Sequence, residues 1–163
     1  MSPGDLARLV DRHAASLVLY ARQWCGDPED VVQEAFLKLV RQDQAPEDAV
    51  AWLYRVVRNG ALDAAKMAKR RQRRESAAAR SVGWFVEPEV DGLDARTAVA
   101  ALERLPSEQR EVIIARHWGG LNYEQIAAVA GCSASTAFRR YTAGVEDLRK
   151  LLEAPCPNPS SNA

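Results

Sequence analysis

The stretch NYEQIAAVAGCSASTAFRRYTAGVEDLRKLL, residues 122–152, decides the fold because it encodes two helices and the turn between them. Asn122 can cap the first helix, and Gln125, three residues later, can complete a capping box. Gly131 stands where a residue in the left-handed conformation would end that helix. The sequence therefore predicts a short helix between Asn122 and Gly131.

A second, longer helix is predicted to begin at a cap formed by Ser133 or Ser135. Its apolar residues recur every three or four positions and should face inward: Ala134, Ala137, Tyr141, Val145, Leu148 and Leu152. The outward face carries Ser135, Thr136, Phe138, Arg139, Arg140 and Thr142. Two helices around a tight glycine turn form a helix-turn-helix pattern, whose second helix can enter a DNA major groove. The alternative interpretation is a helical hairpin in an ordinary bundle.

The charge of the chain is balanced overall and segregated locally. Its 163 residues suffice for one compact domain or two small ones, and 22 basic residues offset 22 acidic ones. The whole molecule therefore has no general attraction for nucleic acid. Residues 52–74, however, contain eight basic side chains and only one acid, Asp63.

The three cysteines are widely separated in the sequence. Cys25, Cys132 and Cys156 form no C-x-x-C pair, which argues against a disulfide framework and a zinc site. No leader and no long apolar run is present, so we expect a cytoplasmic protein with no membrane contact, metal or other cofactor.

The first helix is predicted over residues 5–24. Its apolar stripe comprises Leu6, Leu9, Val10, His13, Leu17, Tyr20, Ala21 and Trp24, with His13 interpreted as a packed residue rather than a ligand. Asp27 and Pro28 predict the start of a second helix that runs to about Gln42. The buried stripe of this second helix is expected to be Val32, Ala35, Phe36, Leu39 and Val40.

The second helix has another face that mixes charge with one leucine. It consists of Asp30, Gln33, Glu34, Leu37 and Arg41. A solvated face rarely needs such a leucine, so this face is a candidate partner surface. The alternative is a leucine exposed by chance, which is common in soluble proteins.

A third helix is predicted from about Ala49, and a basic run extends it. Trp52, Leu53, Val56, Val57, Gly60 and Ala64 should pack inward, whereas Arg55, Arg58, Asn59, Asp63 and Lys66 should project from the other side. The basic run has a single sign of charge and follows a Trp-Leu-Tyr cluster. This pattern favours phosphate contact with aromatic stacking nearby, and the alternative is a merely solvated face.

The remainder of the chain predicts a second helical module. Residues 76–92 are interpreted as a linker, interrupted by Trp84 and Phe85. Helices are expected over residues 93–105, with Ala98, Val99, Leu102 and Leu105 inward, and over residues 108–118, before the helix pair of residues 122–152. Residues 154–163 have the composition of a disordered tail. The predicted fold is all-α, with domains at residues 1–75 and 93–153.

Three motifs in order resemble those of a known family. They are DVVQEAF at residues 30–36, AWLYRVVRNGALD at residues 51–63, and LPSEQREV at residues 105–112, followed by the helix-turn-helix. In this order the chain resembles an extracytoplasmic-function (ECF, group IV) RNA polymerase sigma factor of the sigma-70 family. The resemblance covers nearly everything from Leu6 to Leu152. It implies that the first module corresponds to the sigma-factor domain called region 2, and the second module to the domain called region 4.

The resemblance implies partners and site residues. The core-polymerase-binding face would be Asp30, Gln33, Glu34 and Leu37, which would dock on the clamp helices of the β′ subunit, and the flap of the β subunit would be a further contact. The −10 region of promoter DNA would meet Arg55, Arg58, Asn59, Lys66, Arg70 and Arg71, together with the loop before their helix. The −35 region would meet Ser135, Thr136, Phe138, Arg139 and Arg140. An anti-sigma factor is another partner that the family allows, and no catalytic residue is implied.

The chain departs from the family pattern in two places. The turn before Asp30 is shorter than is usual in the family. Phe138 and Ala143 stand where relatives often have basic residues, and Glu146 and Asp147 add negative charge. We therefore expect few phosphate contacts from the recognition helix and weak or shape-driven −35 binding.

Two other functions fit parts of the sequence. A free-standing helix-turn-helix regulator would bind duplex DNA without polymerase. A helical adaptor would use the acidic helix and the Trp84-Phe85 pair for protein contacts, but it would leave the basic run and Arg139-Arg140 without a use.

Overall fold

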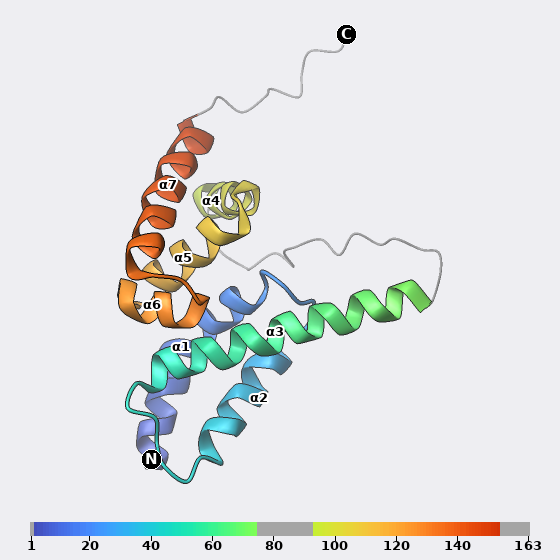
Figure 1. Ribbon diagram of the computed structural model, residues 1–163, viewed down its shortest axis with the longest axis vertical. Coiled ribbons are helices and arrows are strands. Elements are labelled where there is room, and N and C mark those ends of the chain that lie inside the picture. The colour runs from blue at the N-terminus through green and yellow to red at the C-terminus, as the bar shows by residue number, and fades with distance from the viewer. Residues whose placement is uncertain (1, 75–92, 154–163) are drawn as a thin grey trace.

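The computed structural model describes residues 2–74 and 93–153, and within these ranges the chain is all helix and loop, as predicted (Figure 1). The helices are α1 (Pro3–Ala21), α2 (Pro28–Val40), α3 (Ala49–Arg74), α4 (Leu93–Arg104), α5 (Ser107–His117), α6 (Tyr123–Ala130) and α7 (Ala134–Glu153). We call α1–α3 the N-terminal bundle and α4–α7 the C-terminal bundle. The predicted linker with Trp84 and Phe85, the tail and Cys156 lie outside the described residues.

Helix α1 begins and ends through local hydrogen bonds. Ser2 caps it in a capping box with Asp5, and Pro3 occupies the first turn. The helix stops at Ala21, so the predicted end near Trp24 was wrong. There the amide nitrogens of Gln23 and Trp24 donate to carbonyl oxygens only three residues back, at 3.4 and 3.0 Å, which tightens the chain into a turn.

Helix α2 starts at Pro28, as predicted, although the side chain of Asp27 makes no capping hydrogen bond. Val32 and Leu39 are buried as expected. The prediction that Val40 is buried was wrong, because 55% of this residue is exposed. Val40 lies at the edge of the α1–α2 pair, where it lines an open groove instead of meeting a third helix.

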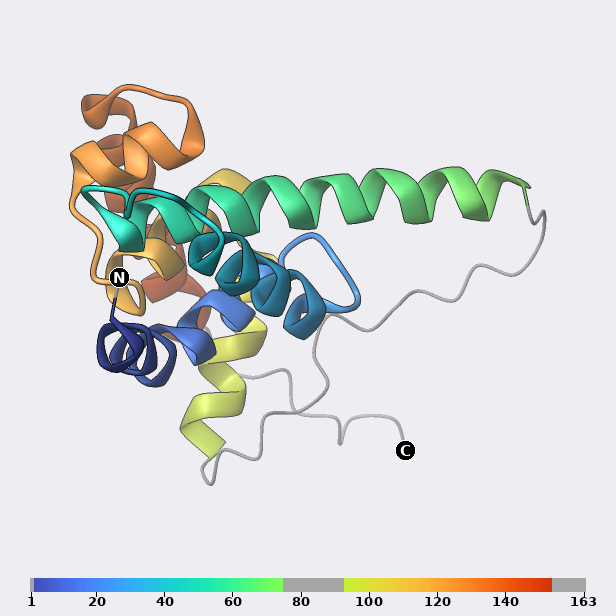
Figure 2. The same ribbon diagram turned by 90° about the horizontal axis from the view of Figure 1, so that it is seen from below.

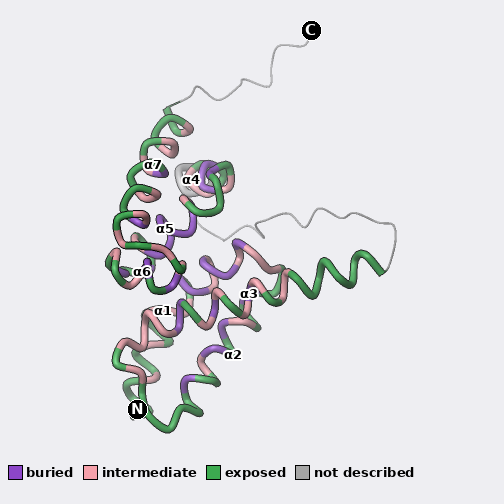
Figure 3. Tube along the Cα trace, in the orientation of Figure 1, coloured by how far each residue is buried: buried purple, intermediate pink, exposed green. Residues whose placement is uncertain are grey.

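Helix α3 crosses the N-terminal bundle and then leaves it. Its first half buries Leu53, Tyr54, Val57 and Ala61. From Lys66 to Arg74 every residue is exposed, and the distal half extends beyond the other helices (Figures 2 and 3). The second half of the helix extends away from the core because the apolar stripe ends and a basic run follows it.

Helix α7 contacts each of the other helices of the C-terminal bundle. Leu102, Leu105 and Ile113 form a small core with the middle of α7. The prediction that Leu152 packs inward was wrong, since 45% of this residue is exposed near the end of the helix. Gly144 allows α5 and α7 to approach closely, because a Cβ at this position would lie 2.8 Å from Cδ1 of Ile113.

The two bundles pack directly against each other. Helix α1 contacts α5, and α3 contacts α6. One buried cluster runs through both bundles, from Leu17 in α1 to Ile126 in α6. At the junction Gly119 lies so close to the Tyr54 ring that a Cβ would come within 2.7 Å of it. None of the described helices is long and apolar enough to cross a bilayer.

Candidate nucleic-acid interface and docking groove

The four residues of α2 that were predicted to bind a partner lie on one exposed face. Asp30, Gln33, Glu34 and Leu37 are spaced by three or four residues, and all four are exposed. Leu37 is 42% exposed, and Glu34 makes a loose ion pair with Lys38, at 3.9 Å. The face thus combines carboxylates with an apolar side chain that the fold itself leaves uncovered.

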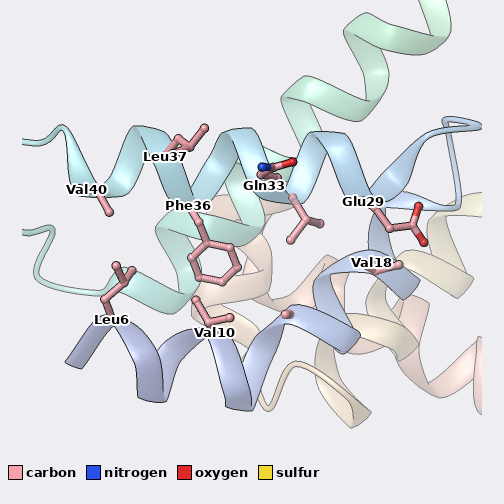
Figure 4. Close-up of a pocket in the computed structure, with 10 residues that line it drawn as sticks. Leu6, Val10, Val18, Glu29, Gln33, Phe36, Leu37 and Val40 are labelled. Atoms are coloured by element: carbon pink, nitrogen blue, oxygen red, sulfur yellow. The ribbon is translucent and has the colours of Figure 1, made fainter. Parts of the chain in front are cut away.

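Beside this face lies an apolar groove of about 410 Å³, which the sequence did not predict (Figure 4). Its lining residues come from α1 and α2: Leu6, Val10, Ala14, Val18, Glu29, Val32, Gln33, Phe36, Leu37 and Val40. Figure 4 shows the Phe36 ring between the two helices, opposite Val10. A signal was present in the sequence, because Val10, Phe36 and Val40 of the predicted apolar stripes line the groove. Gln33 and Leu37 belong to both the groove and the predicted face, which makes them one continuous surface.

Five of the six residues predicted to contact the −10 region lie exposed on α3. They form the basic face of α3: Arg55, Asn59, Lys66, Arg70 and Arg71. Lys66 forms an exposed ion pair with Asp63 at 3.4 Å. A surface ion pair of this kind contributes little and is readily exchanged for phosphate.

Arg58 was expected on the same face, but it points toward α5. Its Nε donates to Oε1 of Glu111 at 2.6 Å, and its guanidinium lies 5.9 Å from the centre of the Trp24 ring. Burial acts to lower the pKa of Arg58, but the hydrogen bond and charge of Glu111 outweigh it and raise the pKa above its usual value. In this conformation Arg58 is therefore occupied by a carboxylate of the chain itself.

The aromatic residues that precede the basic run are core residues. Tyr54 is fully buried, and its hydroxyl donates to Oγ of Ser16 at 3.0 Å. Burial raises the pKa of Tyr54 to about 12. The stacking role suggested for the Trp-Leu-Tyr cluster is thus wrong for Tyr54 in this conformation, whereas Trp52 is half-buried against the core, as expected.

The helix-turn-helix has the capping residues and the glycine turn that the sequence predicted. Asn122 and Gln125 form both hydrogen bonds of the capping box, at 2.8 and 2.7 Å, and Gly131 ends α6 with a φ of 69°. Ser133 is the cap of α7, because its Oγ accepts from the Thr136 amide at 3.1 Å.

The recognition helix exposes only part of the predicted −35 set. Ser135, Phe138 and Arg139 are exposed, and Phe138 is held edge-on against Tyr123 with ring centres 5.4 Å apart. Thr136 is half-buried. Arg140 was expected to face outward, but it is half-buried and pairs with Glu108 of α5 at 2.8 Å. Its pairing partner comes from another helix, so no spacing within α7 could have indicated it.

The described residues contain no cluster of side chains that could hold a metal ion. The described cysteines, Cys25 and Cys132, are free and half-buried. Burial raises the pKa of Cys25, which makes its thiolate less accessible.

Two family models match the chain in order. Sigma-70 region 2 matches residues 9–75, and Sigma-70 region 4 matches residues 96–148. The ECF RNA polymerase sigma factor SigL of Mycobacterium tuberculosis is 34% identical over 154 residues, which cover 89% of this chain and 87% of SigL. SigJ of the same organism is 31% identical over 140 residues, but this chain spans only 43% of its length.

Solved structures show the same architecture. The sigma factor RpoE from Bartonella quintana, in complex with the anti-sigma factor NepR, superposes with a TM-score of 0.71 at 28% identity, over 92% of this chain and 98% of RpoE. CnrH in complex with the cytosolic domain of CnrY gives a TM-score of 0.64 at 25% identity, over 94% and 90% of the two chains. Given a relative of this identity that matches almost end to end, the chain belongs to the ECF RNA polymerase sigma factors of the sigma-70 family.

Proposed function

We propose that this chain binds bacterial core RNA polymerase and directs it to promoters, where it promotes DNA melting and transcription initiation. The observation that carries the proposal is the ordered match of region 2 and region 4 along one chain. This function is that of a non-enzymatic initiation factor, which works in the cytoplasm with the transcription machinery. The free-standing regulator is not favoured, because it would leave the region 2 architecture without a use.

The docking surface proposed for polymerase is the α2 face together with the groove. Asp30 and Glu34 supply negative charge, whereas Leu37 and the groove supply apolar area that no described helix covers. A patch of apolar surface rimmed by charge is typical of a protein interaction site. The clamp helices of the β′ subunit are the proposed occupant in the holoenzyme, and an anti-sigma factor that covers the same surface would compete with them.

The two DNA-reading surfaces are the basic face of α3 and the exposed start of α7. We assign the −10 region to the first and the −35 region to the second. Ser135, Phe138 and Arg139 are the members of the predicted −35 set that are exposed and free to approach bases. Phosphate contacts by α3 should contribute more to the electrostatic part of DNA binding than those by α7, because exposed basic residues are more numerous on α3.

The proposal is tested by reversing charge on the α2 face with Asp30→Arg and Glu34→Arg. We expect helical content to be retained, with a loss of at most about 1–2 kcal/mol of stability from the helix dipole and the lost pair with Lys38. Affinity for core polymerase should fall by several kcal/mol, because like charges then face the docking partner. Run-off transcription should fall in parallel.

The matched control is Glu146→Arg with Asp147→Arg, which makes the same charge change on α7, far from the groove. It should leave core-polymerase binding unchanged. Undiminished binding by the α2 variant would contradict the docking assignment. Tight binding of the unmodified protein to promoter duplex alone at physiological salt would favour the free-standing regulator instead.

A further inference from the structure

An apolar ring is exposed on the helix that is proposed to read the −35 region. Phe138 lies in the second turn of α7, and 52% of this residue is exposed. Ser135 and Thr142, three residues before it and four after it, share its side of the helix and are exposed as well. A single exposed apolar residue is ordinary on a protein surface, so the exposure of Phe138 does not by itself indicate a function.

The ring of Phe138 is held in place by residues of two other helices. The ring of Tyr123, the first residue of α6, meets it edge-on, with the planes at 90° and the centres 5.4 Å apart. Tyr123 is fixed in turn by Arg116 of α5, whose guanidinium lies 5.1 Å from the centre of the tyrosine ring. The same guanidinium donates to the Leu121 carbonyl oxygen at 2.8 Å, which ties it to the turn before α6. A side chain exposed by chance needs no such support, whereas a binding residue gains affinity when it is positioned before its ligand arrives.

The chemistry of a phenyl ring limits what Phe138 can recognise in DNA. The ring carries no charge, so it cannot neutralise a phosphate, and it has no polar group that could pair with the polar edges of bases. The apolar group that bases present in the major groove is the C5-methyl of thymine. Cytosine, adenine and guanine lack this methyl group, so an apolar contact with it distinguishes thymine from the other three bases.

The polar side chains near the ring are engaged with other atoms. The hydroxyl of Thr142 donates to the Phe138 carbonyl oxygen at 2.9 Å, within α7 itself. Arg140 pairs with Glu108 of α5 at 2.8 Å. At this point of the recognition helix, the ring is therefore the group that can discriminate between bases without being released from a partner.

We propose that Phe138 selects a thymine in the −35 element by packing against its C5-methyl group, and that Tyr123 positions the ring for this contact. The assignment deepens the proposed function and rests on it, because it requires that α7 lies in the major groove of promoter DNA. Phe138 is then the specificity-determining residue at one base pair. Such a contact gives base selectivity to a helix that offers few basic residues to the DNA.

The test uses the holoenzyme, assembled from the full chain and core polymerase, and a promoter library randomised over the −35 element. We expect the transcribed templates to share a thymine at one position on either strand. At that position thymine is then replaced by uracil, which differs from it only in lacking the methyl group. Open-complex formation should fall about fourfold, the change expected when one methyl group is no longer buried. Cytosine and 5-methylcytosine form a second matched pair, in which the methylated base should be favoured about fourfold.

Substitutions in the protein assign this effect to the ring. Phe138→Ala should make thymine and uracil equivalent at this position, and it should keep the fold because the side chain is largely exposed. Tyr123→Leu should reduce the fourfold difference, whereas Tyr123→Phe, which keeps the ring edge, should retain it. The control Thr142→Ser removes a methyl group from a neighbouring exposed residue and keeps its hydroxyl, so the fourfold difference should persist.

Equal open-complex formation with thymine and uracil throughout the −35 element would overturn the proposal, as would a library in which no thymine is preferred. A thymine–uracil difference that persists in Phe138→Ala would also overturn it, because another group would then contact the methyl. If Phe138→Ala weakens both templates and leaves their ratio unchanged, the ring only supports the helix and the proposal is wrong. If the holoenzyme transcribes no member of the library, the proposed function itself fails, and this contact fails with it.

Discussion

At the scale of single residues, Gly144 sets how closely α7 approaches α5. A Cβ at this position would lie 2.8 Å from Cδ1 of Ile113 and 3.0 Å from Cβ of Gln109. Gly144→Ala should gain about 1 kcal/mol in helix propensity but lose about 1–3 kcal/mol through overpacking. We therefore expect net destabilisation in urea unfolding.

The double variant Gly144→Ala with Ile113→Val provides the control, because Val lacks the Cδ1 atom that the new Cβ would meet. Its loss of stability should be smaller than the sum of the two single losses. Strict additivity would show that crowding against Ile113 is not the cause.

The His13 side chain should make stability depend on pH. Its Nδ1 is buried without a hydrogen-bond partner among the described residues. Burial, assisted by the charge of Arg12, lowers the pKa of His13 below its usual 6.5. The unfolded chain therefore takes up the proton first, so this contribution to stability is present above pH 6.5 and is lost as pH falls. As pH falls from 7.5 to 5, the free energy of unfolding should decline less steeply for His13→Leu than for the unmodified protein. Equal slopes for the two proteins would contradict this account.

At the scale of elements, the distal half of α3 carries exposed positive charge and contributes no buried residue to the core. Arg70, Arg71, Arg73 and Arg74 are exposed and lie beyond the last buried residue of the helix, Ala61. Replacing all four by Gln should reduce the magnitude of the salt-dependence slope of open-complex formation. The expected reduction is about 0.7–0.9 for each DNA phosphate that the variant no longer neutralises.

The control for this element is a set of four exposed arginines on other helices, Arg8, Arg12, Arg104 and Arg149, also changed to Gln. That set removes the same net charge and should leave the slope nearly unchanged. If the two sets behave alike, the basic run acts only as a solvated face.

At the scale of the whole molecule, the shared core predicts cooperative unfolding. One buried cluster includes residues of α1, α2, α3, α5, α6 and α7. We expect a single calorimetric transition whose calorimetric and van't Hoff enthalpies agree, because neither bundle can expose its half of the cluster alone without cost. Two separated transitions would mean that the bundles are stable independently and that the junction contributes little.

The sequence alone determined the all-α class, the order of the helices, and the helix caps and glycine turn of the helix-turn-helix. These features follow from short-range chemistry: Asn122 and Gln125 satisfy the free amides of one helix end, and Gly131 adopts a conformation that other residues avoid. The exposed α2 face around Leu37 was also predictable, because three- and four-residue spacing places such residues together. The family followed from motifs in a fixed order.

Only the tertiary structure decided which partner each face meets. Periodicity identifies the outward face of α3 and α7, but it cannot show that Glu111 and Glu108 from α5 pair with Arg58 and Arg140. Val40 was wrongly predicted to be buried for the same reason, because an apolar stripe does not show where the helix that covers it ends. The close packing of the two bundles depends on interactions between residues far apart in the chain, such as Tyr20 and Glu111, and local sequence carries no record of such distances.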